Sequence, residues 1–399
     1  MLARVAARST TRRAFAAAAP LSRRHLSSDA SPRELELLQQ VSRLEARVHE
    51  VESMLPPRTR PERITDWENI TFGIIPTNGH VRHTWSSVTS SWDHGRFITD
   101  PWINMHIHAG VLHYGMTLFE GCKAFRTKDN RVVVCNLNEN SARMNTGAAR
   151  LVMPPVPQKM FNDAVDWAVR ANAEFVPPYG TGGSMYIRPF LMGTGPILGL
   201  QPCPEFTFMV SVTPVGNYFG KGGVQGIHAS VSPDFDRAAP RGTGDVKAGG
   251  NYAADLLPLK IAKAEGYGTT LYLDSTEQKY IEEFSVSNFL GIDKTGAYCT
   301  PHSRSILPSI TNKMLMQLAA DKGIDVQPRL IGYDELPHFQ EVGACGTATV
   351  CVPIASITHG DTKLEFGKFD ILNELREELM AIQLGDAEDK HGWMREVQC

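Results

Sequence analysis

The amino-acid sequence predicts an α+β protein of two domains with mixed sheets, and three observations lead to this. The chain has 399 residues, which is too long for one ordinary core. From residue 70 onward, short β-like runs alternate with helical stretches. Glycine and proline are dense at 213–223, where we place the boundary. We therefore expect a small α/β domain over 61–213, an interdomain linker over 214–223 and a large α/β domain over 224–399.

The first 28 residues differ in composition from the rest of the chain. They contain six arginines and no acidic residue, with many Ala, Ser and Thr. Arg4, Arg8 and Arg12 are four residues apart and would line one face of an amphipathic helix. This composition is typical of a mitochondrial transit peptide; a disordered basic tail is the alternative. We therefore expect the protein in the mitochondrial matrix.

Residues 29–60 predict a helical, coiled-coil-like extension followed by a linker. Ser31-Pro32-Arg33-Glu34 forms a capping box with proline at the first helical position, and Pro56-Pro57 ends the helix. Apolar residues follow at alternating spacings of four and three: Leu37, Val41, Leu44, Val48, Val51 and Leu55. This is the pattern of a two-stranded coiled coil. The alternatives are that the stripe packs on the protein's own surface or stays disordered.

The compact part of the chain alternates between the two kinds of regular structure. Continuous apolar runs predict buried strands, and apolar residues at helical spacing predict amphipathic helices. Strands are expected at 132–134, 206–212, 268–273 and 284–291, and helices at 160–175, 251–264 and 309–321.

Composition excludes several classes of protein. A hydrophobic fraction of 42%, a charged fraction of 21% and a net charge of −3 are ordinary for a globular protein and give no support for nucleic-acid binding. No run approaches the roughly 18 apolar residues that span a bilayer, so we expect no membrane association. The seven cysteines include no C-x-x-C pair, which argues against a disulfide framework, a sulfur-rich zinc site or a short regulatory disulfide.

Two segments contain residues suited to catalysis. Lys247 lies between two glycine pairs in the stretch 242–252, just before a predicted helix, so its amine can approach a ligand with little crowding. Glu283 leads into a strand pattern in the stretch 282–289. Taken singly, a loop cation and a solvated turn acid are the more common explanations of such residues.

Seven motifs in order over roughly residues 71–384 resemble the branched-chain-amino-acid aminotransferases, which are class IV, fold-type-IV pyridoxal-phosphate enzymes. They are Tyr114-Gly115-Met116-Thr117-Leu118-Phe119-Glu120-Gly121, Tyr186-Ile187-Arg188-Pro189, Pro214-Val215-Gly216-Asn217-Tyr218-Phe219, 247–252, 283–288, Leu307-Pro308-Ser309-Ile310-Thr311 and Gly346-Thr347-Ala348. The resemblance implies a two-domain fold with the cofactor at the domain interface and a homodimeric transaminase. Its expected reaction is reversible amino transfer from Leu, Ile or Val to 2-oxoglutarate, giving branched-chain 2-oxo acids and glutamate.

The resemblance also implies which residues bind pyridoxal 5'-phosphate. Lys247 would carry the cofactor covalently and move the substrate proton. Glu283 would keep the pyridine nitrogen protonated, and Tyr252 would bond the 3'-oxygen. The phosphate would be bound by Arg143 and by the amides of Ile310 and Thr311, and Thr347 would also contact the cofactor.

The substrate pocket implied by the resemblance is largely aromatic. It comprises Tyr114, Phe119, Tyr186 and Arg188, with Thr347 and Ala348 taking the substrate carboxylate. Leu198 and Leu200 would lie on a loop that reaches the site of the neighbouring subunit. Without the resemblance, aromatic residues at such positions are expected in a core.

Three residues depart from the family pattern and put affinity and substrate range in doubt. Asn312 replaces an arginine after the phosphate loop, Val286 replaces a hydroxyl residue, and Cys345 lies in the carboxylate loop. The run His106-Ile107-His108 with His113 could suggest a metal site, but no carboxylate or thiol is spaced to complete it, so we expect no metal.

Two other functions are compatible with parts of this sequence. A D-amino-acid aminotransferase or an aminodeoxychorismate lyase of the same fold would share Lys247 and Glu283 but not the Tyr186–Arg188 and 346–348 motifs. A non-catalytic scaffold that acts through its N-terminal helix is a third possibility, and intact Lys247, Glu283 and Arg143 argue against it.

Overall fold

The computed structural model divides into two compact units, Met1–Thr59 and Arg60–Cys399. It describes residues 61–216 and 226–399 and eight residues of the first unit: Arg33, Glu36, Leu37, Gln40, Val41, Arg43, Leu44 and Arg47. These eight are helical and exposed. The predicted transit peptide, the rest of the predicted helix at 31–55, and Asn217, Tyr218 and Phe219 of the third motif lie outside the described residues. The coiled-coil contact therefore stays a prediction.

The first sheet of the second unit is antiparallel throughout the described residues. Its strands are β1 (His80–Ser86), β2 (Ser91–Trp92), β3 (Arg96–Ile98), β4 (Thr117–Phe119), β5 (Cys122–Arg126), β6 (Val132–Cys135), β7 (Ser184–Gly193), β8 (Glu205–Val215) and β18 (Met394–Val397). The order is β18-β6-β5-β7-β8-β1-β2, with β3 beside β1 and β4 beside β7. The expectation of a mixed sheet was wrong here, because none of these neighbours is joined by a crossover that returns the chain in parallel.

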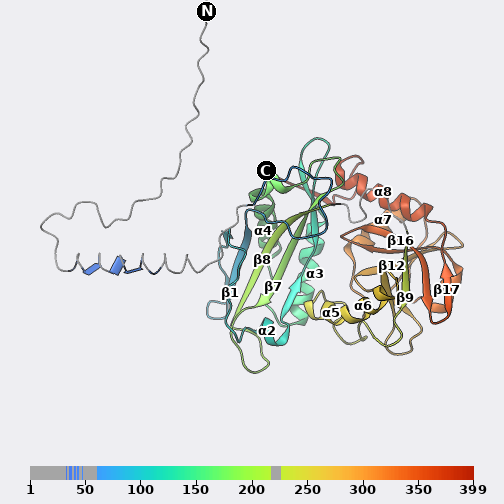
Figure 1. Cartoon of the computed structure of the whole chain (residues 1–399), viewed down its shortest axis with the longest axis horizontal. Helices are drawn as coiled ribbons and strands as arrows, with labels where there is room; N and C mark the ends of the chain where they lie inside the picture. Colours follow the sequence, from blue (N-terminus) through green and yellow to red (C-terminus); the bar gives the residue numbers. More distant parts are fainter. Residues whose placement is uncertain are drawn as a thin grey trace, which may run out of the picture. The chain divides into compact units, whose positions relative to one another are not determined.

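Helices α3 (Leu137–Arg150) and α4 (Gln158–Ala171) cover this sheet (Figure 1). Phe161 of α4 is fully buried and stacks on Phe208 of β8, with ring centroids 5.5 Å apart. The short helix α2 (Gly110–Tyr114) precedes β4, and a 3₁₀ turn (Ala173–Phe175) follows α4. The predicted strands at 132–134 and 206–212 are thus confirmed. The predicted helix at 160–175 is also confirmed as α4, but it ends at Ala171.

The second sheet mixes parallel and antiparallel pairs and closes on itself. Its strands are β9 (Ile227–Val231), β10 (Thr269–Leu273), β11 (Ile281–Phe284), β12 (Ser287–Asp293), β13 (Tyr298–Pro301), β14 (Val326–Arg329), β15 (Phe339–Gly346), β16 (Val350–His359) and β17 (Thr362–Glu365). The pairing of β11 with β12 joins the ends of the path β11-β10-β9-β16-β15-β12, so six strands form a ring. Strand β13 continues from β12 to β14, and β17 pairs with β16.

Two expected elements are each divided in the structure. The run 284–291 is not one strand, because Glu283 faces Asn288 and Phe284 faces Ser287 across a hairpin whose loop is Ser285-Val286. The helix expected at 251–264 is two helices, α5 (Gly249–Ala254) and α6 (Leu256–Ala264), which meet at Asp255. The carboxylate of Asp255 accepts hydrogen bonds from Tyr272 and Ser285, which anchors the junction to the second sheet.

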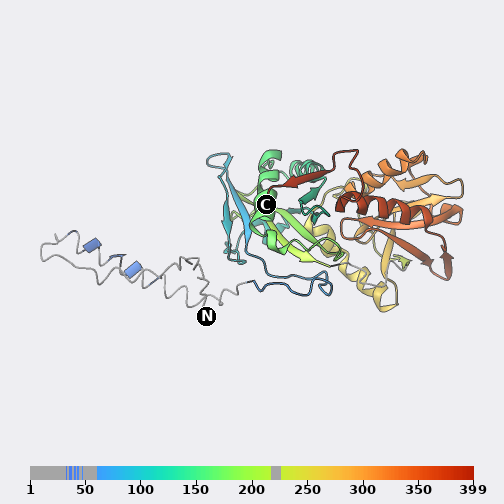
Figure 2. The same ribbon diagram turned by 90° about the horizontal axis from the view of Figure 1, so that it is seen from above.

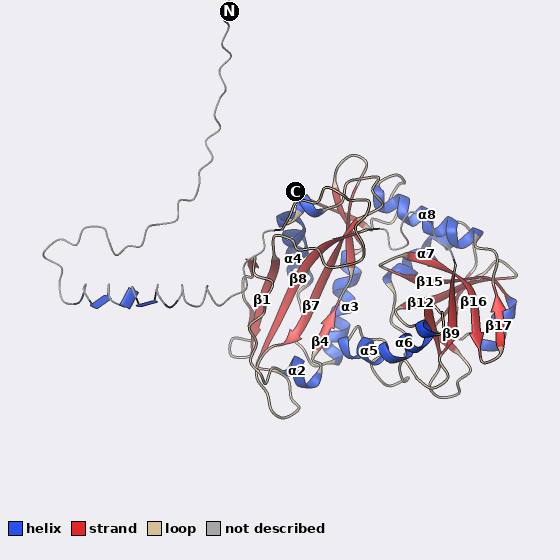
Figure 3. Cartoon of the chain, in the orientation of Figure 1, coloured by secondary structure: helices blue, strands red, loops and turns tan. Residues whose placement is uncertain are grey.

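Helices α7 (Ile310–Asp321) and α8 (Asp370–Leu384) pack on the second sheet, and a 3₁₀ turn (Tyr333–His338) precedes β15 (Figure 3). The two sheets lie side by side in both views (Figures 1 and 2). One buried cluster joins Phe125 and Val133 of the first sheet to Met314 and Leu375 of α7 and α8. In the described part of the chain, no helix is long and apolar enough to cross a membrane.

The chain leaves the first sheet after β8 and enters the second with β9. The expected large domain at 224–399 needs one correction, since residues 394–397 return to the first sheet, where β18 pairs with β6. The division of residues 61–399 into two domains stays a prediction.

Candidate active site

Lys247 lies where the first sheet meets the segment that leads into α5. Its carbonyl accepts a hydrogen bond from the amide of Phe119 at 3.1 Å, which attaches the lysine backbone to β4. Gly244 permits this path, because a Cβ at that position would lie 2.1 Å from the carbonyl oxygen of Ser305. The Lys247 Nζ is 2.9 Å from the Tyr252 hydroxyl and 4.8 Å from the centre of the Phe119 ring.

Burial, together with a smaller effect of the nearby Arg143 cation, lowers the pKa of Lys247 to about 7. A large fraction of this amine is therefore uncharged near neutral pH, whereas an ordinary lysine is almost fully protonated there. Burial also raises the pKa of Tyr252 to about 12, so this hydroxyl stays protonated. The pair is suited to nucleophilic chemistry at a carbonyl carbon.

Glu283 is buried at the end of β11, opposite the lysine segment. Its Oε1 lies 2.8 Å from Arg237 Nη1 and accepts the amide of Leu307 at 2.9 Å. Burial raises the pKa of Glu283 to about 7, and the Arg237 cation and the Leu307 hydrogen bond oppose that rise. Asn288, its partner across the hairpin, donates to the carbonyl of Leu307 at 2.8 Å and fixes the same loop.

Arg143, on α3, is held by a carboxylate that the sequence analysis did not single out. Its Nε and Nη2 donate to the two oxygens of Glu120 at 2.8 and 2.6 Å, and Glu120 is fully buried. Asn140 donates to the same carboxylate at 2.8 Å. The remaining Nη1 reaches the carbonyl of Pro308 at 2.9 Å, so the guanidinium lies at the start of α7.

The N-terminus of α7 presents unused amides beside Arg143. The Ser309 hydroxyl caps the helix by accepting the amide of Asn312 at 3.1 Å. Neither Ile310 nor Thr311 donates its amide to another described residue. Two free amides, a helix N-terminus and a guanidinium together fit a phosphate group. Asn312 is not part of this cradle, because its side chain is bonded to Tyr298 at 2.6 Å and to Thr300 at 2.9 Å.

The turn between β15 and β16 carries the Gly346-Thr347-Ala348 motif. The amide of Thr349 donates to the carbonyl of Gly346 at 3.3 Å, which leaves the amides of Thr347 and Ala348 without a partner among the described residues. Val350 follows with φ of 64°, a left-handed conformation that costs a β-branched residue on the order of 1–3 kcal/mol. Two free amides on a constrained turn fit a carboxylate.

Aromatic residues of the first sheet line the space next to Lys247. Arg188 Nη2 donates to the Tyr186 hydroxyl at 3.0 Å, and its guanidinium lies 4.7 Å from the centre of the Phe119 ring. Phe119 in turn contacts Tyr252 edge to face, with centroids 4.8 Å apart. Gly121 allows Tyr186 to approach, since a Cβ there would lie 2.3 Å from its hydroxyl oxygen. The structure thus brings Phe119, Tyr186 and Arg188 together with Lys247.

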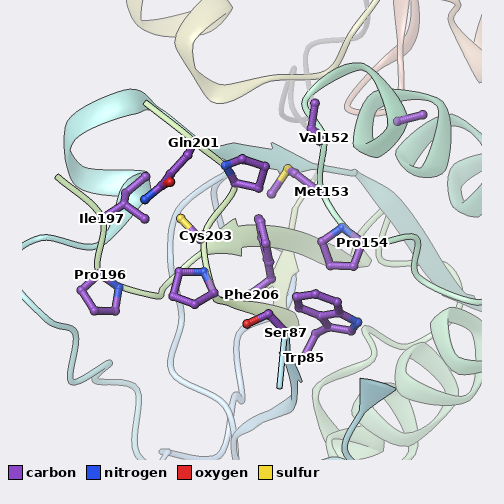
Figure 4. A pocket seen from close by; sticks show the side chains of 13 residues that line it. Trp85, Ser87, Val152, Met153, Pro154, Pro196, Ile197, Gln201, Cys203 and Phe206 are labelled. Atoms are coloured by element: carbon purple, nitrogen blue, oxygen red, sulfur yellow. The ribbon is translucent and has the colours of Figure 1, made fainter. Parts of the chain in front are cut away.

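Tyr114, Leu198 and Leu200 form a separate group at the edge of the first sheet. The Tyr114 hydroxyl donates to the carbonyl of Leu198, and both leucine side chains are about four-fifths exposed, at 83% and 79%. No contact within the described part of the chain links them to Lys247. An uncharged pocket of about 670 Å³ adjoins their loop (Figure 4), lined by residues such as Ile197, Cys203 and Trp85. It contains no acid, base or nucleophilic amine and is not the site described above.

The side chain of Val286 is exposed in the β11–β12 hairpin, shortly after Glu283, and its backbone adjoins the Gly346-Thr347-Ala348 turn, because a Cβ at Gly346 would lie 4.0 Å from the Val286 carbonyl oxygen. The ring of His108 stacks on that of His113 and is tilted against that of His106. No metal-binding group of three His, Cys, Asp or Glu residues exists among the described residues. All seven cysteines are free.

The spacing argument against a short disulfide was incomplete. Cys345 and Cys351 are direct partners across β15 and β16, so the hairpin places side by side two thiols that are six positions apart in sequence.

Sequence reasoning missed the two charged residues that hold the site together. Glu120 was named only as part of the first motif and was given no role, although an acidic residue directly before a glycine within a family motif could have been singled out. No local sequence pattern marks Arg237, because its role depends on Glu283 of β11, which is brought beside it only by the fold. Both lie within the site in the structure.

Comparison with known proteins agrees with this geometry. Residues 117–357, more than half of the chain, match the family described as amino-transferase class IV. The branched-chain-amino-acid aminotransferase of Helicobacter pylori is 42% identical over 335 residues, which cover 83% of this chain and 98% of that protein. Branched-chain-amino-acid aminotransferase 5, chloroplastic, of Arabidopsis thaliana is 42% identical over 82% of this chain and 79% of its own length.

A solved structure shares the fold. The branched-chain amino acid aminotransferase of Escherichia coli superposes with a TM-score of 0.67 at 26% identity, covering 79% of this chain and 99% of its own. A second branched-chain amino acid aminotransferase, solved with pyridoxamine 5'-phosphate, has a TM-score of 0.66 at 26% identity over 79% of this chain and 98% of its own. The chain therefore belongs to the class IV aminotransferases, and among them to the branched-chain-amino-acid aminotransferases.

Proposed function

We propose that this protein is a transaminase that transfers the amino group of Leu, Ile or Val to 2-oxoglutarate, with pyridoxal 5'-phosphate as its cofactor. The observation that carries the proposal is that Glu283 and Arg143 both lie close enough to Lys247 to act on its charge, while Arg143 reaches Pro308, next to the free amides of α7. These groups fit the aldehyde, the pyridine nitrogen and the phosphate of that cofactor. When bound, the cofactor supplies an electron sink for the substrate Cα.

Lys247 would bind the cofactor through its amine. Its lowered pKa leaves a reactive lone pair near neutral pH, and the Tyr252 hydroxyl at 2.9 Å orients it. When the substrate takes the place of Lys247 on the cofactor, the freed Nζ would accept the proton from the substrate Cα. The same Nζ would donate a proton during the second half of the reaction.

Glu283 would hold a proton on the pyridine nitrogen. A carboxylate can do this only while it is ionised, and Arg237 at 2.8 Å favours the ionised form in a buried place. Arg143 and the amides of Ile310 and Thr311 would bind the phosphate, with Glu120 fixing the orientation of the guanidinium.

The substrate would enter between the Thr347–Ala348 turn and the Phe119–Tyr186 wall. The free amides of the turn would bind its carboxylate, and the aromatic wall would favour a branched apolar side chain. Arg188, beside Tyr186, places a cation within reach of the second carboxylate of 2-oxoglutarate or glutamate.

A homodimer and a mitochondrial location complete the proposal. Leu198 and Leu200, together with Tyr114, would extend to the site of a second copy of the chain. This contact would explain why two apolar side chains are exposed on one loop. The arginine-rich, acid-free first 28 residues support import into the mitochondrial matrix.

The proposal is tested by a coupled assay of glutamate formation from L-leucine and 2-oxoglutarate. We expect Leu, Ile and Val to exceed Asp, aromatic amino acids and D-alanine by orders of magnitude in kcat/KM, because the aromatic wall favours a branched apolar side chain of limited size. Faster turnover of D-alanine would favour a D-amino-acid aminotransferase, lyase activity on aminodeoxychorismate would favour the lyase, and no turnover with bound cofactor would favour the scaffold.

A further inference from the structure

Lys123 on β5 contacts the carboxylate turn from the opposite sheet. Its Nζ donates to the carbonyl of Ala348 at 2.7 Å, across 225 positions of sequence. Two residues earlier on the same segment, the carbonyl of Gly121 accepts the Thr347 hydroxyl at 3.3 Å. The first sheet therefore holds both central residues of the turn, one through its side chain and one through its carbonyl.

The ammonium of Lys123 has no carboxylate partner. Among the described residues, no acid lies within ion-pair distance of it, and burial alone accounts for the lowering of its pKa to about 8. It remains mostly protonated at neutral pH. A partly buried cation without a counter-ion is costly, unless a ligand supplies the negative charge.

The turn that contains Thr347 and Ala348 needs contacts that fix its backbone. Its free amides, at Thr347 and Ala348, belong to a short connection that ends in the left-handed Val350. Strained backbone of this kind persists only where the surroundings fix it. The hydrogen bond from Lys123 fixes the peptide group between Ala348 and Thr349, whose amide donates to Gly346, and the bond from the Thr347 hydroxyl to Gly121 fixes the preceding residue. The free amides of Thr347 and Ala348 therefore belong to residues that are held on both sides.

We propose that Lys123 is the positioning residue of the carboxylate turn: it holds the Thr347 and Ala348 amides in the orientation that binds the carboxylate of the substrate. The proposal rests on the proposed transamination and concerns only the carboxylate end of the substrate. Tyr186, which pairs with Lys123 across β5 and β7, places the aromatic wall next to this tether. The paired strands β5 and β7 would thus position both the residues that bind the substrate carboxylate and those that contact the substrate side chain.

The test compares ligands that differ only in the carboxylate, on the cofactor-loaded enzyme. 4-Methylvalerate is leucine without its amino group, and 3-methylbutylamine is leucine without its carboxylate. In K123M, we expect the Kd of 4-methylvalerate and the KM of L-leucine and L-valine to rise by a common factor, on the order of tenfold to a hundredfold, because a charge-assisted hydrogen bond is lost. The Kd of 3-methylbutylamine should change by less than about twofold, and kcat by less than about threefold.

Two further variants complete the experiment. K123R keeps the charge and the donor and should restore most of the affinity for 4-methylvalerate. K128M removes an exposed lysine just after β5, as the matched control, and should leave every value unchanged. If K123M does not fold, K123Q serves instead, since its amide ends one atom short of Nζ.

Equal binding of 4-methylvalerate by K123M and the unmodified protein would overturn the assignment, as would equal losses for the acid and the amine. A failure of the proposed function is separate from these outcomes, because it would appear as absent leucine turnover in the unmodified protein.

Discussion

The guanidinium of Arg237 lies 2.8 Å from the Glu283 carboxylate, and both side chains are almost completely buried. Burial raises the pKa of Glu283 to about 7, while Arg237 acts in the opposite direction. Near neutral pH, the charge of Glu283 therefore depends strongly on Arg237, which favours the ionised form more than the Leu307 hydrogen bond does. An ionised Glu283 would be needed to keep the pyridine nitrogen protonated. Arg237 would therefore affect the chemistry of the cofactor through the charge of Glu283.

Removing Arg237 should shift the pH dependence of the rate. In R237M, the pKa of Glu283 rises further, so the carboxylate becomes ionised only at higher pH. The acidic limb of kcat/KM should move to higher pH, and activity lost at pH 7 should partly return at pH 9. The same variant should lose stability, but less than the about 3–5 kcal/mol expected for an unpaired buried charge, because Glu283 takes up a proton and becomes neutral. An unshifted acidic limb would separate Arg237 from the reaction.

E283Q tests the acid itself. Glutamine keeps the size of the side chain and should keep the cofactor, which is also bound through Lys247 and the phosphate cradle. Its amide cannot hold a proton on the pyridine nitrogen, so kcat should fall by about two orders of magnitude or more. Absorbance measures cofactor content, and the coupled assay measures rate. Activity close to that of the unmodified protein would remove Glu283 from the site.

K247A should abolish turnover while leaving the fold intact, because only a primary amine can attach the cofactor. Borohydride reduction of the loaded protein, followed by peptide mapping, should label Lys247. K260A, at an exposed lysine of α6, is the control and should be labelled at Lys247 and remain active. A label on any other lysine would refute the assignment.

Loading of the cofactor should depend on pH as the amine of Lys247 does. Burial lowers the pKa of this lysine from 10.5 to about 7. The rate of covalent loading of cofactor-free protein should therefore rise through pH 7 as the amine loses its proton and level off well below pH 10. Stopped-flow absorbance follows it. A rate that still rises through pH 10 would indicate an ordinary lysine.

Oxidants should act slowly on the paired thiols Cys345 and Cys351. Burial raises the pKa of Cys351 to about 12 and raises that of Cys345 well above its usual value, so neither forms the reactive thiolate at neutral pH. Mild peroxide should leave activity nearly unchanged over an hour. A rapid loss that dithiothreitol reverses would show that the two thiols form a disulfide across the β15–β16 hairpin.

Local patterns predicted much of the fold. The apolar runs at β6 and β8 and the amphipathic α4 appear where expected, because burial dictates their composition. The hairpin at Ser285-Val286 was missed, since apolar residues flank it on both sides and no glycine or asparagine marks the turn. The return of β18 was missed because its pairing with β6 depends on a contact more than 250 positions away.

The residues of the site likewise fall into those that the sequence predicted and those that it did not. Lys247 and Glu283 were found because glycine pairs and a strand pattern surround them and because the family motifs include them. Arg237, Glu120 and Lys123 were not singled out, because each gains its role only from a partner in a distant segment. The sequence contains these residues without local features that distinguish them from surface charges.

The most direct test of the whole account is the visible absorption spectrum of the purified protein before and after addition of L-leucine. We expect a band from the lysine-bound cofactor that bleaches on mixing with L-leucine and returns on addition of 2-oxoglutarate, with glutamate appearing in equal amount. A protein that takes up no pyridoxal 5'-phosphate, or whose band is unchanged by L-leucine, would contradict the central claim.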